Sequence, residues 1–314
     1  MKTVRYEESL KNQWNDFLRN AKNYHFFFHR EYLSYHQDRF EDFSLLFYDD
    51  KEKLIALLPA NKSDETTLFS HQGLTYGGFI VNDNMKQETM LELFEALKAY
   101  LKEEGFSQVI YKTIPFIHHL KPAQEDLYAL FIQNAKLIQR DAGAVIDLQK
   151  PVKYSNGRKW SLKKAKKEGF EIEESRDFAQ FWGLLEEILK QQHDSKPVHS
   201  LDEITLLNER FPKNIRLFLV KKEGKLFAGG ITFENPELCH LQYVANSNEG
   251  RKIGALDFLI DDLIHKRKEE GYRYFDFGTS NEENGRVLNA GLIDQKERFG
   301  ARVVVNDRYE WSLS

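Results

Sequence analysis

Polar residues suited to acid–base chemistry follow a buried run near the end of the chain. Asp276 lies within the apolar run 274–277, and Glu282 and Arg286 follow in a glycine-containing polar segment. Open α/β sheets commonly bind ligands beyond the carboxyl ends of their strands. A carboxylate there can accept a proton from an attacking amine, so Asp276 and Glu282 are candidate catalytic bases. Asp276 alternates with Tyr274, and it therefore faces either solvent or a cleft.

Two residues further along the chain are candidates for contact with substrate. Lys296 precedes the Phe-Gly pair at 299–300, next to an expected helix end. Most lysines are solvated surface charges, but a lysine at this place can also stabilise an oxyanion or a donor phosphate. Asn289, together with Arg286, is a candidate contact for an acceptor molecule.

The segment 246–255 joins an expected strand to an expected long helix and contains both glycines and cations. Free backbone N–H groups and the helix dipole make such a helix start favourable for an anion. An ordinary loop turned by glycine is the alternative interpretation. The residues that would hold the anion are Asn246, Gly250, Arg251, Lys252 and Gly254. The corresponding junction in the first half of the chain, 81–87, has no glycine.

The signature motifs of several enzyme classes are missing from the sequence. There is no phosphate-binding loop ending in Gly-Lys-Ser/Thr, no His-Glu-x-x-His, no Cys-x-x-Cys and no Gly-x-Ser-x-Gly. His118 and His119 lack carboxylates at metal-ligand spacing, and the single cysteine, Cys239, lies in an apolar run. We therefore expect no metal, and transfer chemistry that needs only positioning and charge stabilisation.

Two patterns occur twice in the same order, which indicates a duplicated domain. The first pattern is an apolar run, a charged turn and the start of a second apolar run. It ends at Leu54 and occurs again ending at Leu226, 172 positions later (226 − 54). A Lys-Glu-Glu-Gly helix end followed by an apolar strand starts at Lys102 and again at Lys268, 166 positions later (268 − 102). A chain of 314 residues has room for two such domains.

We expect the domains at 1–150 and 151–314, each with an α/β (α+β) fold in which helices flank a mixed, mostly antiparallel sheet. In the first domain, the alternation of β-prone runs and a charged turn predicts a hairpin at 43–59. Further strand is expected over 68–81. Apolar residues at helical spacing predict an amphipathic helix over 86–104.

The overall charge restricts the partners that the chain can attract. A net charge of −4 and a pI near 6.2 exclude a global attraction to nucleic acid or to an anionic membrane. The basic segment 158–167 is the local exception. It is either a solvated helix balanced by the acids at 171–174 or a surface that faces phosphates. Neither a signal peptide nor a run of about 18 apolar residues occurs, so we expect a soluble, cytoplasmic protein.

Three segments, taken in order, resemble the GNAT (acyl-CoA N-acyltransferase) superfamily and in particular its FemAB-like branch. They are the basic segment 158–169, the strand 275–278 and the helix 291–300 that ends in Phe-Gly. The resemblance implies two tandem GNAT-like domains that transfer an acyl or aminoacyl group to an amine. The second domain would bind the donor. The first would shape an acceptor groove, whose implied lining residues are His71, Tyr76 and Gly77.

The resemblance implies acyl-CoA as donor, or aminoacyl-tRNA as in the branch that extends cell-wall peptides. The superfamily's coenzyme loop reads Gln/Arg-x-x-Gly-x-Gly/Ala, and here Leu256 stands where a small residue belongs. A leucine disfavours close approach of the backbone to a pyrophosphate. The implied acceptor is a small molecule or a precursor of the cell envelope or of a polysaccharide. Its amine would attack the donor carbonyl directly, without a covalent enzyme intermediate.

Two other functions fit the same residues. If Leu256 prevents donor binding, the chain is a degenerate acyltransferase that serves as a binding or scaffold module. If the segment 158–167 faces phosphates, the chain is an RNA-associated protein whose binding depends on salt.

Overall fold

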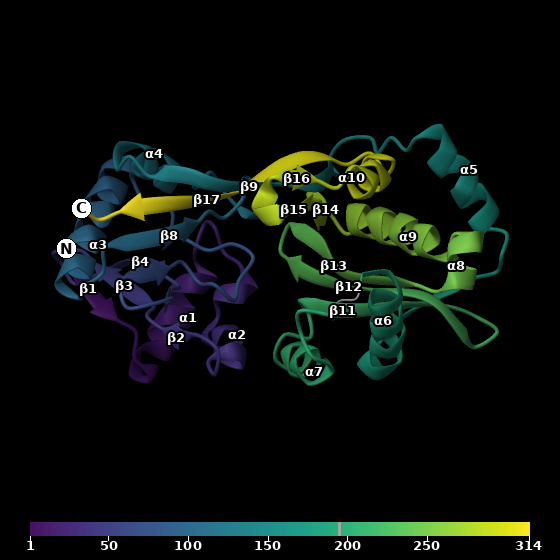
Figure 1. Cartoon of the computed structure of the whole chain (residues 1–314), viewed down its shortest axis with the longest axis horizontal. Coiled ribbons are helices and arrows are strands. Elements are labelled where there is room, and N and C mark those ends of the chain that lie inside the picture. Colours follow the sequence, from purple (N-terminus) through teal and green to yellow (C-terminus); the bar gives the residue numbers. More distant parts are fainter. Residues whose placement is uncertain (194–195) are drawn as a thin grey trace. The chain divides into compact units, whose positions relative to one another are not determined.

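The computed structural model describes residues 1–193 and 196–314, which form two compact units. Unit 1 consists of Met1–Ala142, Asn281–Val287 and Val305–Ser314, and unit 2 consists of Gly143–Ser280 and Leu288–Val304. Three strands, β9 (Lys136–Asp147), β16 (Val287–Leu288) and β17 (Arg302–Ser312), contribute residues to both units. The last strand of the chain thereby joins the sheet of unit 1, where it pairs with β8 (Gln108–Lys112) (Figure 1).

Both hairpins that the repeated pattern predicts are present. In unit 1, β3 (Leu45–Tyr48) pairs antiparallel with β4 (Leu54–Leu58). In unit 2, β11 (Ile215–Lys222) pairs antiparallel with β12 (Lys225–Asn235). The turn between β11 and β12 has positive φ at both of its residues, 223 and 224. Two positive φ values in a two-residue turn match the twist of the flanking strands.

The second repeated pattern, a helix that ends at glycine and leads into a strand, is also present in both units. In unit 1, α3 (Gln87–Glu103) leads into β8, and in unit 2, α9 (Ala255–Glu269) leads into β14 (Tyr274–Thr279). Gly105 and Gly271 end the two helices with φ of +87° and +86°. Glycine adopts this left-handed conformation without a steric cost from a side chain.

The core of unit 1 forms beneath α3. Apolar residues at helical spacing, among them Met90, Leu93 and Leu97, are buried against β-strand residues such as Phe47 and Val109. Each of these large side chains contributes about 1.5–3 kcal/mol by leaving water. The other elements of unit 1 are β1 (Lys2–Arg5), α1 (Lys11–Arg19), α2 (Arg30–Leu33), β2 (Glu41–Asp42), β5 (Asn61–Lys62), β6 (Thr67–Phe69), β7 (Ile80–Val81), α4 (Glu125–Ile132) and β15 (Asn281–Glu282).

The expected strand over 68–81 is present only at its two ends, as β6 and β7. Residues between them form an irregular loop, because Gly78 adopts a φ of +93° and Gly77 lies against the backbone of Ser70. A side-chain carbon on Gly77 would lie 2.0 Å from the Ser70 carbonyl oxygen. The glycines therefore allow a tight loop at this place.

The strands of unit 2 pair in the order β10-β11-β12-β13-β14, and β14 pairs in turn with the unit 2 part of β9. α9 packs its apolar residues, such as Leu259 and Leu263, on one face of this sheet. The expected helix from 253 divides at Gly254, where φ is +76°. The remaining elements are α5 (Asn156–Ala165), β10 (Glu171–Ser175), α6 (Phe178–His193), α7 (Leu201–Arg210), β13 (Leu238–Asn246), α8 (Asn248–Ile253) and α10 (Ala290–Glu297).

The pairing confirms the expected α/β (α+β) class with mostly antiparallel strands. Two pairs are parallel, β6 with β8 in unit 1 and β13 with β14 in unit 2. In the described part of the chain, no helix is both long and apolar enough to span a membrane.

Candidate active site

A histidine and a carboxylate meet where two strands of unit 2 stop pairing. The parallel pairing of β13 with β14 runs from Leu238 and Tyr274 to His240 and Asp276, whereas β13 itself continues to Asn246. His240 and Asp276 are the last partners in register. Their side chains are joined by a 2.7 Å contact between Nδ1 of His240 and Oδ2 of Asp276.

The two side chains lie on the face of the sheet opposite α9. Their chain neighbours Cys239 and Phe275 belong to the core beneath α9, and strand residues alternate between faces. The His240 side chain keeps 20% of its surface exposed, and that of Asp276 keeps 10%. The pair is therefore largely desolvated, yet the imidazole can be reached by a ligand.

Backbone and side-chain groups hold the pair in place. Gly278 donates its backbone N–H to Oδ1 of Asp276 at 2.8 Å. Gly278 has a φ of +72°, and a side-chain carbon on it would lie 3.1 Å from Cε1 of His240. Nε2 of His240 lies 3.0 Å from Oε1 of the Gln242 side chain. Gln242 lies at a bulge, because the register of β12 against β13 shifts between Ile231 and Thr232.

This arrangement has the geometry of an oriented general base. With a proton on Nδ1, His240 donates to Asp276, and Nε2 becomes the acceptor atom once the Gln242 side chain, whose Oε1 faces it, turns away or presents its NH₂ group. The carboxylate fixes this tautomer and stabilises the imidazolium that forms when Nε2 takes a proton. The pair can therefore remove a proton from an amine that reaches Nε2.

Asp276 is among the candidates predicted from the sequence, and His240 is not. The signal was present in the alternation of β13, where Cys239 and Leu241 join the core and His240 and Gln242 do not. That alternation shows a polar face on an apolar strand. It does not reveal that the histidine lies opposite Asp276, because the register of β13 with β14 is a long-range feature.

Lys296, on α10, lies next to the pair and anchors the backbone that follows Asp276. Its Nζ donates to the carbonyl oxygens of Gly278 and Thr279 at 3.0 and 2.7 Å and to Oγ of Ser280 at 2.9 Å. An ammonium group has three N–H donors, and each has an acceptor here. Burial lowers the pKa of Lys296 to about 8, although the nearby Asp276 acts in the opposite direction. A role as direct ligand of an oxyanion or phosphate stays a prediction.

The other candidates in this region have separate positions. Glu282, in β15, and Arg286 are exposed and belong to unit 1. Asn289 belongs to unit 2 and caps α10, because its Oδ1 accepts a hydrogen bond from the backbone N–H of Leu292 at 3.0 Å. Their roles in catalysis or acceptor binding stay predictions.

The predicted anion-binding segment 246–255 folds as two helices with a break at Gly254. Ser247 caps α8 by accepting the backbone N–H of Gly250. Gly250 has no space for a side chain, because a side-chain carbon would lie 2.6 Å from the carbonyl oxygen of Phe227 and 2.5 Å from Oδ1 of Asn246. Packing thus accounts for Gly250. Arg251 and Lys252 are exposed on α8 and are the cations of this segment that face solvent.

The resemblance to the GNAT superfamily predicts that the pyrophosphate of acyl-CoA binds at the first turn of α9. In the structure, α5 covers this turn. The methyl group of Ala165 would lie 3.2 Å from a side-chain carbon on Gly254. Asp257, in the first turn of α9, forms an ion pair with Arg158 and accepts a hydrogen bond from Ser161 at 3.0 Å. While α5 stays in this position, the start of α9 is covered and carries a carboxylate. It therefore does not fit a pyrophosphate. Acyl-CoA as donor stays a prediction that requires α5 to move or the phosphates to bind elsewhere.

The acceptor-side candidates lie inside unit 1. His71 and Tyr76 are 4% and 6% exposed, and Gly77 is packed on Ser70. The Tyr76 hydroxyl lies 2.5 Å from Nε2 of His25. Burial, and secondarily the neighbouring His36, holds the pKa of His71 well below its usual range. Their part in acceptor binding stays a prediction.

Lys112 holds the loop that carries these candidates. Its Nζ donates to the carbonyl oxygens of His71 and Gln72 at 3.1 and 3.2 Å, and also to that of Leu74. Burial lowers its pKa to about 7. A buried lysine therefore fixes a loop by its carbonyls in unit 1, as Lys296 does in unit 2.

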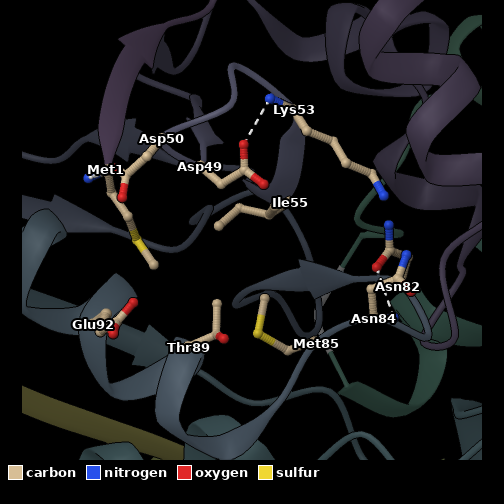
Figure 2. A pocket seen from close by; sticks show the side chains of 10 residues that line it. All are labelled: Met1, Asp49, Asp50, Lys53, Ile55, Asn82, Asn84, Met85, Thr89 and Glu92. Carbon is tan, nitrogen blue, oxygen red and sulfur yellow. Dashed lines mark hydrogen bonds and ion pairs between the residues drawn. The ribbon is translucent and has the colours of Figure 1, made fainter.

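A surface pocket of about 240 Å³ in unit 1 borders the start of α3, the helix that corresponds to α9 (Figure 2). Apolar Ile55 and Met85 line it together with charged groups. The lining contains two cations, the side chain of Lys53 and the N-terminal ammonium of Met1, and three carboxylates, those of Asp49, Asp50 and Glu92, so negative charge is in excess. Carboxylates repel an anion at such short range. The unit 1 counterpart of the predicted anion site is therefore unfavourable for phosphate.

Comparison with known proteins identifies the fold. Residues 155–284 match the family model of the acetyltransferase (GNAT) domain. No curated protein matches the chain. Among solved structures, FemX is similar over 99% of this chain and 97% of its own, with a TM-score of 0.71 at 13% identity.

Two further solved structures share the architecture. L-PGS from Bacillus licheniformis matches with a TM-score of 0.59 at 15% identity, over 86% of this chain and 84% of its own. A tandem GNAT protein from the clavulanic acid biosynthesis pathway matches with a TM-score of 0.53 at 10% identity, over 100% of this chain and 98% of its own. Residues 155–284 therefore form a GNAT domain, and the chain has the FemAB-like tandem GNAT fold.

Proposed function

We propose that the chain is an N-acyltransferase in which His240, oriented by Asp276, deprotonates the acceptor amine. The observation that carries this proposal is the 2.7 Å contact between the two side chains at the point where β13 and β14 separate. The GNAT domain supports acyl transfer as the reaction class. The fold shared with FemX and L-PGS supports, by analogy of fold, an acyl or aminoacyl group and an acceptor from the cell envelope.

The reaction needs one proton acceptor and no covalent enzyme intermediate. The amine nitrogen attacks the donor carbonyl, the new C–N bond forms, and the bond from the carbonyl carbon to the leaving oxygen or sulfur breaks. The amine proton passes to Nε2 of His240 and then to the leaving atom. Asp276 stabilises the imidazolium between these two transfers.

Within this proposal, the second domain (151–314) is the donor side, because it contains His240 and Asp276. The first domain (1–150) is the acceptor side. The exposed Arg251 and Lys252 of α8 are the proposed contacts of the donor's phosphates. Glu282, Arg286 and Asn289 are proposed to contact the acceptor.

A transfer assay tests the proposal. The full chain is incubated with a pool of cell-wall precursor peptides and, in separate reactions, acetyl-CoA or a mixture of aminoacyl-tRNAs. Mass spectrometry then detects any peptide that gains an acyl or aminoacyl group. We expect transfer from one donor, reduced on the order of 10²–10⁴-fold in His240→Gln. His265→Gln is the control, because that histidine lies on the exposed side of α9. Equal rates in His240→Gln and wild type would contradict the proposal.

One observation favours a second candidate, a binding module without catalysis. The first turn of α9, where the resemblance predicts the coenzyme phosphates, is covered by α5 and contains the carboxylate of Asp257. If neither acetyl-CoA nor aminoacyl-tRNA supports transfer in the assay above, we expect the chain to be a binding module without catalysis. Its expected property is stabilisation by an acceptor peptide without turnover, measured as a rise of the unfolding midpoint.

A further inference from the structure

Helix α5 presents a basic face to solvent that the proposed reaction does not use. Its inner face consists of Arg158, Leu162 and Ala165, which are buried. The exposed side of α5 and the two residues after it consist of Lys159, Trp160, Lys163, Lys164, Lys166 and Lys167. We call this set the α5 basic face. The helix α5 itself lies at the edge of unit 2 (Figure 1).

The lysines of the α5 basic face are not neutralised by the surrounding protein. Lys166 forms an ion pair with Asp261 at 2.8 Å. In the described part of the chain, Lys159, Lys163, Lys164 and Lys167 form no ion pair. No acidic residue occurs in α5. Four positive charges therefore remain on one side of a short helix.

The acidic residues that follow α5 in the sequence are paired elsewhere. Glu173 forms an ion pair with Lys221, and Glu174 forms one with Arg216 at 2.7 Å, both across to β11. Glu168 lies 3.4 Å from Lys222. The interpretation of a helix balanced by the acids at 171–174 therefore does not hold for Glu173 and Glu174, whereas Glu171 forms no ion pair within the described residues.

The basic face has a cost for the helix itself. Lysines at i and i+4, such as 159 with 163 and 163 with 167, destabilise a helix by about 0.2–0.5 kcal/mol per pair. The helix dipole favours Lys163 and Lys164 in the last turn, but it does not favour Lys159 in the first turn. A ligand of opposite charge would remove the repulsion.

The exposed tryptophan narrows the class of ligand. Trp160 is 70% exposed, whereas Trp14, Trp182 and Trp311 are at most 2% exposed. Tryptophan is enriched at the interface between lipid and water, where its ring lies at the level of the headgroups. Lysines on the same helix face attract anionic headgroups, and clusters of four to eight basic residues on a helix are typical of binding to anionic lipids.

From these observations we propose that the α5 basic face docks the protein reversibly on an anionic lipid bilayer. Trp160 enters the headgroup layer and the four unpaired lysines contact lipid phosphates. A membrane fits better than RNA, because a nucleic-acid interface buries about 600–1,000 Å² even for a single module and is basic throughout. Here the cluster of unpaired basic residues is confined to α5 and the two residues after it.

Vesicle binding tests this assignment with the full chain. Sedimentation with phosphatidylcholine vesicles is compared with sedimentation with vesicles that also contain phosphatidylglycerol, at low and high salt. We expect binding only to the anionic vesicles and its loss at high salt, since salt screens exposed charges. Trp160 is the single well-exposed tryptophan of the chain, so its fluorescence should shift to shorter wavelength on binding.

Matched variants make the test specific. The fourfold variant K159Q/K163Q/K164Q/K167Q should weaken binding on the order of a hundredfold or more, and Trp160→Ala should abolish the fluorescence shift. The control K86Q/K102Q/K190Q/K213Q removes the same charge from exposed lysines elsewhere. It should bind as wild type does.

Three results would overturn the proposal. They are no binding to anionic vesicles at low salt, an equal loss in the control, or salt-dependent binding of total RNA that the α5 variant loses while vesicles are not bound. The last result would assign the α5 basic face to RNA. Peptide-acceptor transfer by the α5 variant reports separately on the proposed enzyme activity, because none of the four lysines contacts His240 or Asp276.

Discussion

At the scale of single residues, the site depends on a short chain of contacts that ends at an imidazole. Lys296 fixes the backbone carbonyls of Gly278 and Thr279, Gly278 donates to Asp276, and Asp276 orients His240. Each contact limits the freedom of the next. A base that is held in one orientation loses less entropy when the amine arrives.

Gly278→Ala should damage the site more than it damages the fold. Alanine at a φ of +72° costs about 1–2 kcal/mol of unfolding free energy, and its methyl group would lie 3.1 Å from Cε1 of His240. Gly271→Ala is the matched control, with a φ of +86° and no atom within 4 Å of the added carbon. Urea unfolding should show similar losses for both variants. The transfer rate should fall only in Gly278→Ala, and equal rates in the two variants would remove Gly278 from the site.

Lys296 predicts a pH dependence of stability. Its pKa in the folded protein is about 8, below the ordinary 10.5, so the unfolded chain binds this proton more tightly. Unfolding therefore takes up protons between these values, and the contribution of Lys296 to the free energy of unfolding rises with pH in this window. The difference between wild type and Lys296→Met should grow in favour of wild type from pH 8 to 10.5. A difference between wild type and Lys296→Met that stays constant over this range would contradict the burial argument.

At the scale of elements, the local patterns of the sequence were sufficient for the hairpins and for the helices that end at glycine. Alternating apolar residues, charged turns and Gly105 or Gly271 are local signals. The loop between β6 and β7 was not predictable, because Lys112 holds it from a strand that is distant in the sequence. His240 was missed for the same reason, since its partner is defined by the register of β13 with β14.

The position of α5 predicts how the chain responds to a coenzyme. α5 covers the first turn of α9, and Arg158 pairs with Asp257 there. If the phosphates of acetyl-CoA bind only at this helix start, acetyl-CoA should leave the unfolding midpoint of the wild-type chain unchanged. A ligand present at a hundredfold excess over its Kd stabilises the folded state by about 2.7 kcal/mol. A rise of the unfolding midpoint by several degrees with acetyl-CoA would show that α5 does not block binding at the first turn of α9.

At the scale of the whole molecule, the two units repeat a scaffold but not its chemistry. Both have the hairpin, the helix that ends at glycine and the strand behind it. The position that corresponds to Asp276 is Ile110 (276 − 166), an apolar residue of β8. The start of α3 faces carboxylates, and the start of α9 is covered. The proposed acid–base chemistry therefore belongs to unit 2 alone.

The central claim is that His240 and Asp276 act as one catalytic unit, and a double-mutant cycle tests it most directly. Transfer rates are measured for wild type, His240→Gln, Asp276→Asn and the double variant, with unfolding midpoints as the control for folding. Because Asp276 acts through His240, each single variant should lose on the order of 10²–10⁴-fold and the double variant no more than His240→Gln alone. Losses that multiply, or a His240→Gln variant with the wild-type rate, would contradict the claim.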